Sequence, residues 1–513
     1  MSRIERIDGN VARVPLYGVA ATRRIEGQAV AELPPFTLMT RAGAAVARLA
    51  LAVAPHAARI VVFAGPGNNG GDGIEAATRL REWGKSTSVL RVGAAATLPG
   101  DAAQALARAI DAGVEIAAFD AQGASTGDRP DLVIDALLGI GASRTPEGEL
   151  VAAIARIAGL AALGARVLAV DVPSGLDVER GQPLGDACVV ADDTLTLIAP
   201  KPGLFTGSGR DHAGRVWCAR LEVEVDAQPG DAWLVGTGDP SCAPAARRHA
   251  SHKGSFGDVA VVGGAPGMAG ATWLAARAAH AAGAGRVFVD LLRDGTGAME
   301  RVDEIDPMRP ELMFRRGWAS GSAAIVAATT TVCGCGGGDA VRASLPRLLS
   351  IAARIVLDAD ALNAIAADPS LATLVTRREQ RGHATIMTPH PLEAARLLGT
   401  TTGAVQADRL RAAREIAALY RSVVVLKGSG TVIADSAGTV RINATGNASL
   451  ASAGTGDVLA GWIAGRWASH GTDAFDTATR AVIEHGAVAE PDRSAALRAA
   501  DLVELLHRRA RGV

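Results

Sequence analysis

The segment Gly454-Thr455-Gly456-Asp457 combines the two kinds of group that phosphoryl transfer requires. The glycines stand before an apolar run through Ile463, which predicts a tight loop that leads into a helix, and the free backbone N–H groups at such a helix start attract anions. A carboxylate there, Asp457, would be repelled by a bound phosphate unless it takes a proton from a hydroxyl aimed at that phosphate. The alternative interpretation is that the glycines form a turn and Asp457 only caps the helix.

A second glycine-rich loop follows a strand near the start of the chain. Residues 59–64 are a β-branched run, residues 65–73 are rich in glycine, and residues 74–83 are helix-like, so together they predict the opening of a nucleotide-binding βαβ unit. The loop contains the spacing G-x-G-x-x-G, but the next strand, residues 87–92, ends in a glycine without an acidic residue to hold a ribose, which disfavours an ordinary dehydrogenase. Two asparagines and Asp72 in the loop suit a cation or a polar ring, whereas the alternative is a plain Asn/Gly turn.

Two further strands of the first half end in polar residues. Leu132–Ile134 leads into Asp135, and Arg166–Val170 leads into Asp171. Taken singly, an aspartate at a strand end is equally compatible with a helix cap. The carboxyl ends of parallel strands share one sheet edge, where ligands bind, and oxygen ligands without His or Cys favour an alkali or alkaline-earth cation. We therefore expect a site formed by Asn69, Asp135, Asp171 and Ser174.

The second half repeats this pattern. Asp258–Val262 is a strand that leads into glycines and a small-residue helix at residues 272–282, so a second α/β sheet begins there. Later strands lead into Asp358, His390 and Lys427. Each of them again delivers polar groups to one edge of a sheet.

Single residues of the second half are open to more than one interpretation. Lys427 and the Gly-Ser-Gly-Thr that follows it have the composition of a phosphate-binding loop, although the residue order of the P-loop motif is absent. His390 is equally compatible with a substrate anchor and with a structural histidine. Cys333 and Cys335 have no second pair and no nearby histidine, so buried or turn cysteines are favoured over a metal site.

Composition and charge favour a two-domain α/β enzyme that acts on small molecules. The chain has 513 residues, of which 49% are hydrophobic, 3% are aromatic and 60 are glycine. Its 52 basic and 53 acidic residues leave no net charge to attract nucleic acid or a membrane surface. Five cysteines without a C-x-x-C pair and an N-terminus without an apolar signal region predict a cytoplasmic protein with neither disulfides nor zinc. Periodicity fades between Glu222 and His249, so we predict domains at residues 1–225 and 226–513.

Three motifs of the first half, together with Leu38-Met39-x-Arg41-Ala42-Gly43, resemble the NAD(P)H-hydrate epimerase domain. They are Asn68-Asn69-Gly70-Gly71-Asp72-Gly73, Asp135-Ala-Leu-Leu-Gly139-x-Gly141 with Arg144, and Asp171-x-Pro173-Ser174-Gly175. The resemblance implies a Rossmann-like three-layer domain that interconverts the R and S forms of NAD(P)H hydrated at nicotinamide C6, with Asp171 as the base. It also implies a potassium ion held by Asn69, Asp135 and Ser174. The hydrate would contact Asn68, Asn69, Gly70, Gly71, Asp72, Gly139, Ile140, Gly141, Ala142, Ser143, Arg144, Thr145 and Asp171.

Five motifs of the second half resemble the ADP-dependent NAD(P)H-hydrate dehydratase, of ribokinase-like α/β fold. They are Gly263-Gly264, Asp358-Ala-Asp360-Ala-Leu-Asn363, Thr388-Pro389-His390-Pro391-x-Glu393, Leu426-Lys427-Gly428-x-Gly430-Thr431 and Ala453-Gly454-x-Gly456-Asp457. The implied reaction phosphorylates the C6 hydroxyl of the S hydrate with ADP and then loses phosphate to give NAD(P)H and AMP, with Asp457 as base and magnesium at the phosphates. ADP would be bound by Lys427, Gly428, Ser429, Gly430, Thr431 and Gly456, and the hydrate by Ala271, Gly338, His390 and Asp457.

Together the two halves resemble the fused bifunctional NAD(P)H-hydrate repair enzymes, and a homo-oligomer that acts on NADHX, NADPHX and ADP is expected. Residues 334–338, Gly-Cys-Gly-Gly-Gly, replace the usual Gly-Pro-Gly-Leu-Gly, and Leu392 replaces a common glycine. A looser glycine loop loses more entropy when it orders around the hydrate.

Two alternative functions stay open at this point. One is a small-molecule kinase of the vitamin-precursor type, which would release a phosphorylated alcohol. The other is a first domain that only binds a ligand or assembles, with no catalytic role.

Overall fold

The structure is a computed structural model that describes residues 3–93, 98–121, 129–225, 229–243, 247–292, 306–471, 473–490 and 496–512. The chain divides into two compact units, which we call the first unit (Met1–Asp8 and Val14–Trp233) and the second unit (Gly9–Arg13 and Leu234–Val513). The division passes through β2 (Arg13–Leu16) and β10 (Ala232–Val235). The predicted domain boundary at residue 226 lies outside the described residues.

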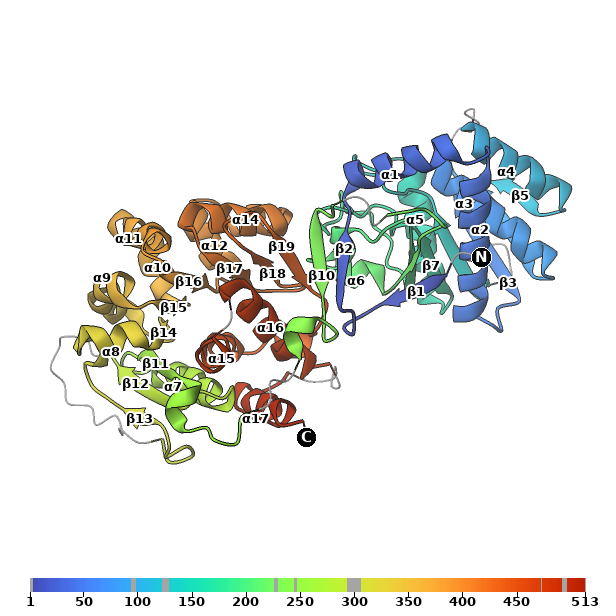
Figure 1. The fold of residues 1–513 in the computed structure, drawn as a ribbon. Coiled ribbons are helices and arrows are strands. Elements are labelled where there is room, and N and C mark those ends of the chain that lie inside the picture. Colours follow the sequence, from blue (N-terminus) through green and yellow to red (C-terminus); the bar gives the residue numbers. More distant parts are fainter. Residues whose placement is uncertain are drawn as a thin grey trace. The chain divides into compact units, whose positions relative to one another are not determined.

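The first unit is a three-layer α/β domain (Figure 1). Its strands are β1 (Ile4–Ile7), β3 (Arg59–Ala64), β4 (Ser86–Arg91), β5 (Glu115–Ala118), β6 (Leu132–Ala136), β7 (Arg166–Val170), β8 (Asp193–Leu197) and β9 (Arg215–Ala219). Its helices are α1 (Val19–Glu32), α2 (Thr37–Val53), α3 (Asn68–Glu82), α4 (Gly100–Asp111), α5 (Glu149–Ala162) and α6 (Gly209–Ala213). One hydrophobic core packs α1 to α4 on one face of the sheet, and another packs α5 on the opposite face.

The sheet of the first unit is parallel except at one edge. Its order is β1-β9-β8-β7-β6-β3-β4-β5, and only β1 runs antiparallel to its neighbour. All residues of β6 are buried, as expected for a strand covered by helices on both faces. The carboxyl ends of β3, β6 and β7 therefore meet at one edge, as the sequence predicts.

The second unit is also built from helices on both faces of a sheet (Figure 1). Its strands are β11 (Asp258–Gly263), β12 (Arg286–Leu291), β13 (Met313–Phe314), β14 (Thr330–Cys333), β15 (Arg354–Leu357), β16 (Ala384–Met387), β17 (Val423–Leu426), β18 (Val432–Ala434) and β19 (Val440–Asn443). Its helices are α7 (Ala269–Ala281), α8 (Ala323–Ala328), α9 (Val341–Ile351), α10 (Asp360–Ala367), α11 (Pro369–Gln380), α12 (Pro391–Leu398), α13 (Thr402–Ala407), α14 (Arg409–Tyr420), α15 (Thr455–His470), α16 (Ala474–Ala487) and α17 (Ala499–Ala510). Helices α7, α15, α16 and α17 share one hydrophobic core with the sheet.

The sheet of the second unit runs β13-β12-β11-β14-β15-β16-β17-β18-β19. The pairs from β12 to β17 are parallel, and β17, β18 and β19 form an antiparallel end. Strands β15 and β17 end directly before Asp358 and Lys427, as the sequence predicts. Their carboxyl ends carry Asp358 and Lys427 to the same edge.

Two helices begin earlier than the sequence predicts. Helix α3 begins at Asn68 rather than Ile74, so the loop after β3 is only residues 65–67. The reason is tight packing, because a methyl group on Gly70 would lie 2.0 Å from the Gly65 carbonyl oxygen and one on Gly71 would lie 2.7 Å from Met39. The glycines thus allow a helix to form against its surroundings instead of forming an open loop. Helix α7 likewise begins at Ala269 rather than Thr272.

No single helix in the described part of the chain is long and apolar enough to cross a membrane. Helices α1 and α2 pass the length and composition test only as a pair bent by 117°. Many residues of α2 are buried in the core of the first unit.

Helix α15 is buried along nearly its whole length, and glycines set its distance from α7. A methyl group on Gly461 would lie 1.9 Å from the Ala275 carbonyl oxygen, and one on Gly465 would lie 2.3 Å from the Ala279 carbonyl oxygen. The glycines and the alanine-rich surface of α7 let the two backbones touch. This contact holds the start of α15 in place.

We expect Gly461→Ala to destabilise the second unit, because its methyl group would collide with backbone atoms of α7. Overpacking of this kind costs about 1–3 kcal/mol and would lower the melting midpoint in calorimetry. Gly159→Ala in α5 is the matched control, because nothing lies within 4 Å of its new methyl group. That control should stabilise its unit by about 0.5–1 kcal/mol. Equal midpoints for the two variants would contradict the packing argument.

Candidate active sites

A cavity of about 440 Å³ lies in the first unit, at the carboxyl ends of its central strands. Among the residues predicted to contact a ligand, those that line it are Asn68, Asn69, Asp72, Gly139, Ile140, Gly141, Ala142 and Asp171. The predicted contacts Gly70, Gly71, Ser143, Arg144 and Thr145 are not among its lining residues. The hydroxyl of Thr145 instead donates to the Leu184 carbonyl oxygen at 2.7 Å.

Asp171 is paired with a buried lysine that the sequence reasoning did not assign to the site. The Lys201 ammonium group donates to the Asp171 carboxylate, to the Thr196 hydroxyl at 2.9 Å and to the Leu197 carbonyl oxygen at 2.8 Å. Its side chain is only 1% exposed. The second Asp171 oxygen accepts from the Ile140 N–H at 3.3 Å. The one available signal was the position of Lys201 shortly after a strand end, as with the predicted aspartates.

Two further carboxyl groups face the same cavity and hold protons more readily than usual. Burial, followed by the charges of Asp171 and Glu26, raises the pKa of Asp72 well above its ordinary value. Burial, followed by the charge of Asp171, raises the pKa of Glu26. The cavity therefore combines an ion-paired carboxylate with carboxyl groups whose pKa values are raised, which is the arrangement that acid–base chemistry requires.

Asp135, Ser174 and Asn69 lie next to this cavity, as the sequence predicts. The Ser174 hydroxyl donates to Asp135 at 2.6 Å, and the Ser174 N–H donates to it at 2.9 Å. Burial raises the pKa of Asp135 to about 6, because no cationic side chain in the described part of the chain neutralises it. The Asn69 Nδ2 atom is buried and has no hydrogen-bond partner among the described residues. An uncompensated carboxylate and an orphaned amide are consistent with a cation site at this position.

In the second unit, Asp457 lies in the first turn of α15 with its carboxylate free of the capping role. The N-cap is Gly454, which has φ of 88° in the left-handed region and makes no side-chain capping bond. Gly454, and not Asp457, is therefore the N-cap residue of the helix. The N–H groups of this first turn precede the hydrogen-bonded part of the helix and form the expected anion-binding end.

Lys427 faces the same helix start and pairs with Asp358. The Lys427 Nζ atom lies 2.7 Å from an Asp358 oxygen and 4.0 Å from Glu393, and a methyl group on Gly456 would lie 3.3 Å from it. Burial favours the neutral amine, but Asp358 and Glu393 raise the pKa of Lys427 above its ordinary value. Burial, partly offset by Lys427, raises the pKa of Glu393 to about 7.

Asp457 lies in a cluster with Asp358 and Cys335. One oxygen of Asp358, one of Asp457 and the sulfur of Cys335 all lie within 4.8 Å of one another. Burial, followed by the charge of Asp358, raises the pKa of Asp457 to about 6, so this carboxylate is ionised at neutral pH but protonates easily. Sequence reasoning missed Asp358 and Glu393 as members of this site, although both stand in the motifs that carry the resemblance.

The unusual loop at residues 334–338 is hydrogen-bonded to neighbouring segments. The Cys335 carbonyl oxygen accepts from Gly264 N–H at 3.1 Å and from the Thr272 hydroxyl at 2.8 Å. The Gly338 N–H donates to Asp360 at 2.8 Å. These bonds hold the extra glycines in one conformation.

His390 caps helix α12 with its ring. Its Nδ1 atom accepts from the Leu392 N–H at 3.1 Å, which leaves Nε2 as the protonated nitrogen, 3.2 Å from Glu393. The side chain is 46% exposed, so this structural bond leaves the outer face of the ring accessible.

The two units thus define a two-domain α/β enzyme with one carboxylate-and-lysine site in each unit, the second beside an anion-binding helix start. Residues 259–508 match the family model of the NAD(P)H-hydrate dehydratase, and residues 35–203 match that of the YjeF-related protein N-terminus. The chain belongs to the family of bifunctional NAD(P)H-hydrate repair enzymes.

Two relatives that match along most of this chain and most of their own length support this assignment. The chain is 37% identical over 461 residues to the bifunctional NAD(P)H-hydrate repair enzyme of Coxiella burnetii, with 88% of this chain and 89% of that protein covered. It is 35% identical over 488 residues to that of Escherichia coli, with 91% and 88% covered. A solved ADP/ATP-dependent NAD(P)H-hydrate dehydratase from Bacillus subtilis is 32% identical over 53% of this chain and 94% of its own, with a TM-score of 0.43.

Proposed function

We propose that the two units divide the repair of hydrated NAD(P)H between them. The first unit interconverts the R and S hydrates at its 440 Å³ cavity. The second unit dehydrates the S form with ADP. The observation that carries this proposal is the carboxylate of Asp457, which is free of a capping role and lies at an anion-binding helix start with Lys427 and Asp358 beside it.

In the second unit, Asp457 accepts the proton of the C6 hydroxyl as that oxygen attacks the terminal phosphorus of ADP. The bond from this phosphorus to the bridging oxygen breaks and AMP leaves. The C6–O bond of the phosphorylated hydrate then breaks, phosphate departs, and loss of the C5 proton restores the ring double bond. Lys427 and the N–H groups of the Gly454–Asp457 turn stabilise the charge on the transferring group. The nucleotide contacts are assigned to Lys427, Gly428, Ser429, Gly430, Thr431 and Gly456, and the hydrate contacts to Ala271, Gly338, His390 and Asp457.

Magnesium suits this site together with the ADP phosphates. Mg²⁺ in such sites takes one or two carboxylates and the substrate's phosphate oxygens. Buried Asp358 and half-buried Asp457 offer carboxylate oxygens within the same 4.8 Å cluster, whereas the Cys335 sulfur is a poor ligand for a hard cation. When bound, the ion supplies charge neutralisation at the phosphates.

In the first unit, Asp171 relays a proton to and from the C6 hydroxyl while the oxygen leaves and returns on the other face of the ring. Lys201 holds this carboxylate in one orientation. Asp72 and Glu26, with their raised pKa values, are the groups able to give a proton to the departing oxygen. Asn69, Asp135 and Ser174 would hold potassium, and its charge would offset the buried Asp135 carboxylate.

Removing each base should stop one reaction and spare the other. With both NADH hydrate epimers, ADP and magnesium, Asp457→Asn should slow the recovery of dihydronicotinamide absorbance by roughly 100-fold or more, because general-base catalysis is lost. Asp171→Asn should consume the S form and stall with the R form left over. The surface variant Asp501→Asn should behave like the unchanged protein. Normal repair by Asp457→Asn would end the proposal for the second unit.

The dehydration rate should fall in acid as Asp457 takes up its proton. Since its pKa is about 6 and only the ionised form accepts a proton, the rate should be half-maximal near pH 6 and drop about tenfold per unit below that. A profile of kcat against pH measures this limb. In Glu393→Gln the half-maximal rate should remain near pH 6. If the acid limb of the profile instead shifts in this variant, the limb reports the titration of Glu393 and not that of Asp457.

Loss of the buried cation should weaken epimerisation selectively. In Lys201→Met the Asp171 carboxylate loses its buried ion-pair partner and is no longer held in one orientation, so the epimerisation rate should fall. A loss of about tenfold to 100-fold is expected, the order that misplacement of a catalytic group causes. The dehydration rate of the same protein controls for folding. An unchanged epimerisation rate would show that Lys201 serves only packing.

A further inference from the structure

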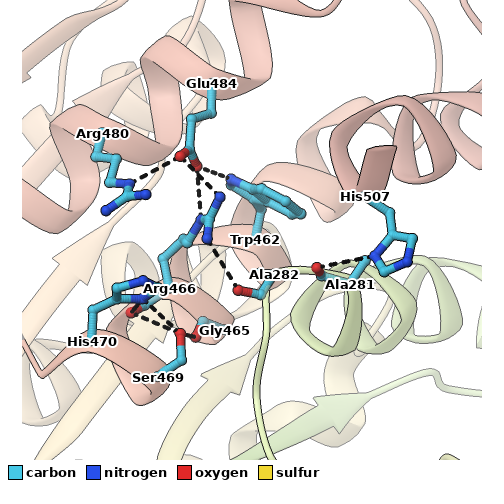
Figure 2. A network of polar contacts seen from close by, with 10 residues as sticks. All are labelled: Ala281, Ala282, Trp462, Gly465, Arg466, Ser469, His470, Arg480, Glu484 and His507. Atoms are coloured by element: carbon cyan, nitrogen blue, oxygen red, sulfur yellow. Dashed lines mark hydrogen bonds and ion pairs between the residues drawn. The ribbon is translucent and has the colours of Figure 1, made fainter. Parts of the chain in front are cut away.

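A second cavity, of about 230 Å³, lies in the second unit away from the Lys427 site. Three arginines from three helices line it: Arg466 of α15, Arg480 of α16 and Arg509 of α17. Figure 2 shows Arg466 and Arg480 turned toward one carboxylate, that of Glu484. Arg466 is nine residues beyond Asp457 on the same helix, roughly 13 Å along its axis.

The hydrogen-bonding capacity of Glu484 is used up by its neighbours (Figure 2). Arg466 binds it with two bonds of 2.8 and 2.9 Å, Arg480 with one of 2.9 Å, and the Trp462 indole N–H with one of 2.8 Å. The described residues that line the cavity thus include three guanidinium groups and one carboxylate, which leaves two positive charges in excess. Burial, followed by the charges of Arg480 and Arg466, lowers the pKa of His470 at the same cavity, as expected beside an excess of positive charge.

Donors remain available for an anion. Arg480 uses only its Nε–H on Glu484, so its two terminal NH₂ groups have no partner among the described residues. Arg509, near the end of α17, likewise has no ion-pair partner in the described part of the chain. The Arg480 side chain is only 13% exposed, and a guanidinium with limited access to water binds oxyanions strongly.

We propose that this cavity binds a phosphate group, separately from the ADP and hydrate sites. Its volume is below the range of about 300–1,000 Å³ that holds whole organic ligands, so a free phosphate ion or the phosphate end of a nucleotide fits it. The planar guanidinium groups of Arg480 and Arg509 supply bidentate hydrogen bonds to the phosphate. The ion pair of Arg466 with Glu484 forms part of the cavity wall.

The test is calorimetric titration of the full chain with inorganic phosphate in the absence of nucleotide, so that no nucleotide phosphate competes for the cavity. Arg480→Gln and Arg509→Gln should each weaken binding about tenfold, the loss of one charge-assisted contact. Arg508→Gln is the matched control, because it removes the same charge from the neighbouring residue of α17, which does not line the cavity. Equal affinity in all four proteins would overturn the proposal.

Two further arms separate the sources of phosphate and guard against misfolding. AMP that binds more tightly than inorganic phosphate, with the same dependence on Arg509, would assign the cavity to a nucleotide's phosphate, and weaker binding of AMP would assign it to the free ion. Crystals soaked in selenate should show selenium between Arg480 and Arg509. Selenate found only beside Lys427 would contradict the proposal even if the variants fail to fold.

Discussion

A buried lysine paired with an aspartate at the carboxyl edge of a parallel sheet is the interaction on which both sites depend. Lys201 pairs with Asp171 in the first unit, and Lys427 pairs with Asp358 in the second. Each aspartate directly follows one strand, and each lysine comes shortly after another strand of the same sheet. Without these cations the carboxylates collected at each edge would repel one another. Each lysine places an opposite charge within hydrogen-bond distance of one carboxylate.

The backbone at both edges is bent in the same unusual way. Asp171 has φ of 66°, and Ala359, the residue after Asp358, has φ of 48°, both in the region that favours glycine. Such conformations cost of order 1–3 kcal/mol and persist only when surrounding bonds hold them. Here the strands hold them, for example through the Asp171 N–H bond to the Leu195 carbonyl oxygen at 2.8 Å.

Helices α15 and α16 connect the Gly454–Asp457 turn to the rest of the second unit. His485 is buried in α16, and its Nε2 atom lies 3.0 Å from the Thr455 carbonyl oxygen, inside the Gly454–Asp457 turn. Its neighbour Glu484 holds Arg466 of α15. The close approach of α15 to α7 through Gly461 adds a third support. The turn is therefore positioned by packing on several sides, which explains why small residues dominate these helices.

The sequence by itself determined the elements and the residues at their ends. Buried strands have local apolar patterns, and the polar residues that follow them identified Asp135 and Asp171, while the glycine turn identified Asp457. The start of α3 was missed, because glycines that suggest a loop are here required by close packing. Only the tertiary structure decided that Lys201 meets Asp171 and that Lys427 meets Asp358. Those pairs depend on strand order, with β8 beside β7 and β17 two places from β15, and strand order is a long-range property that no local pattern encodes.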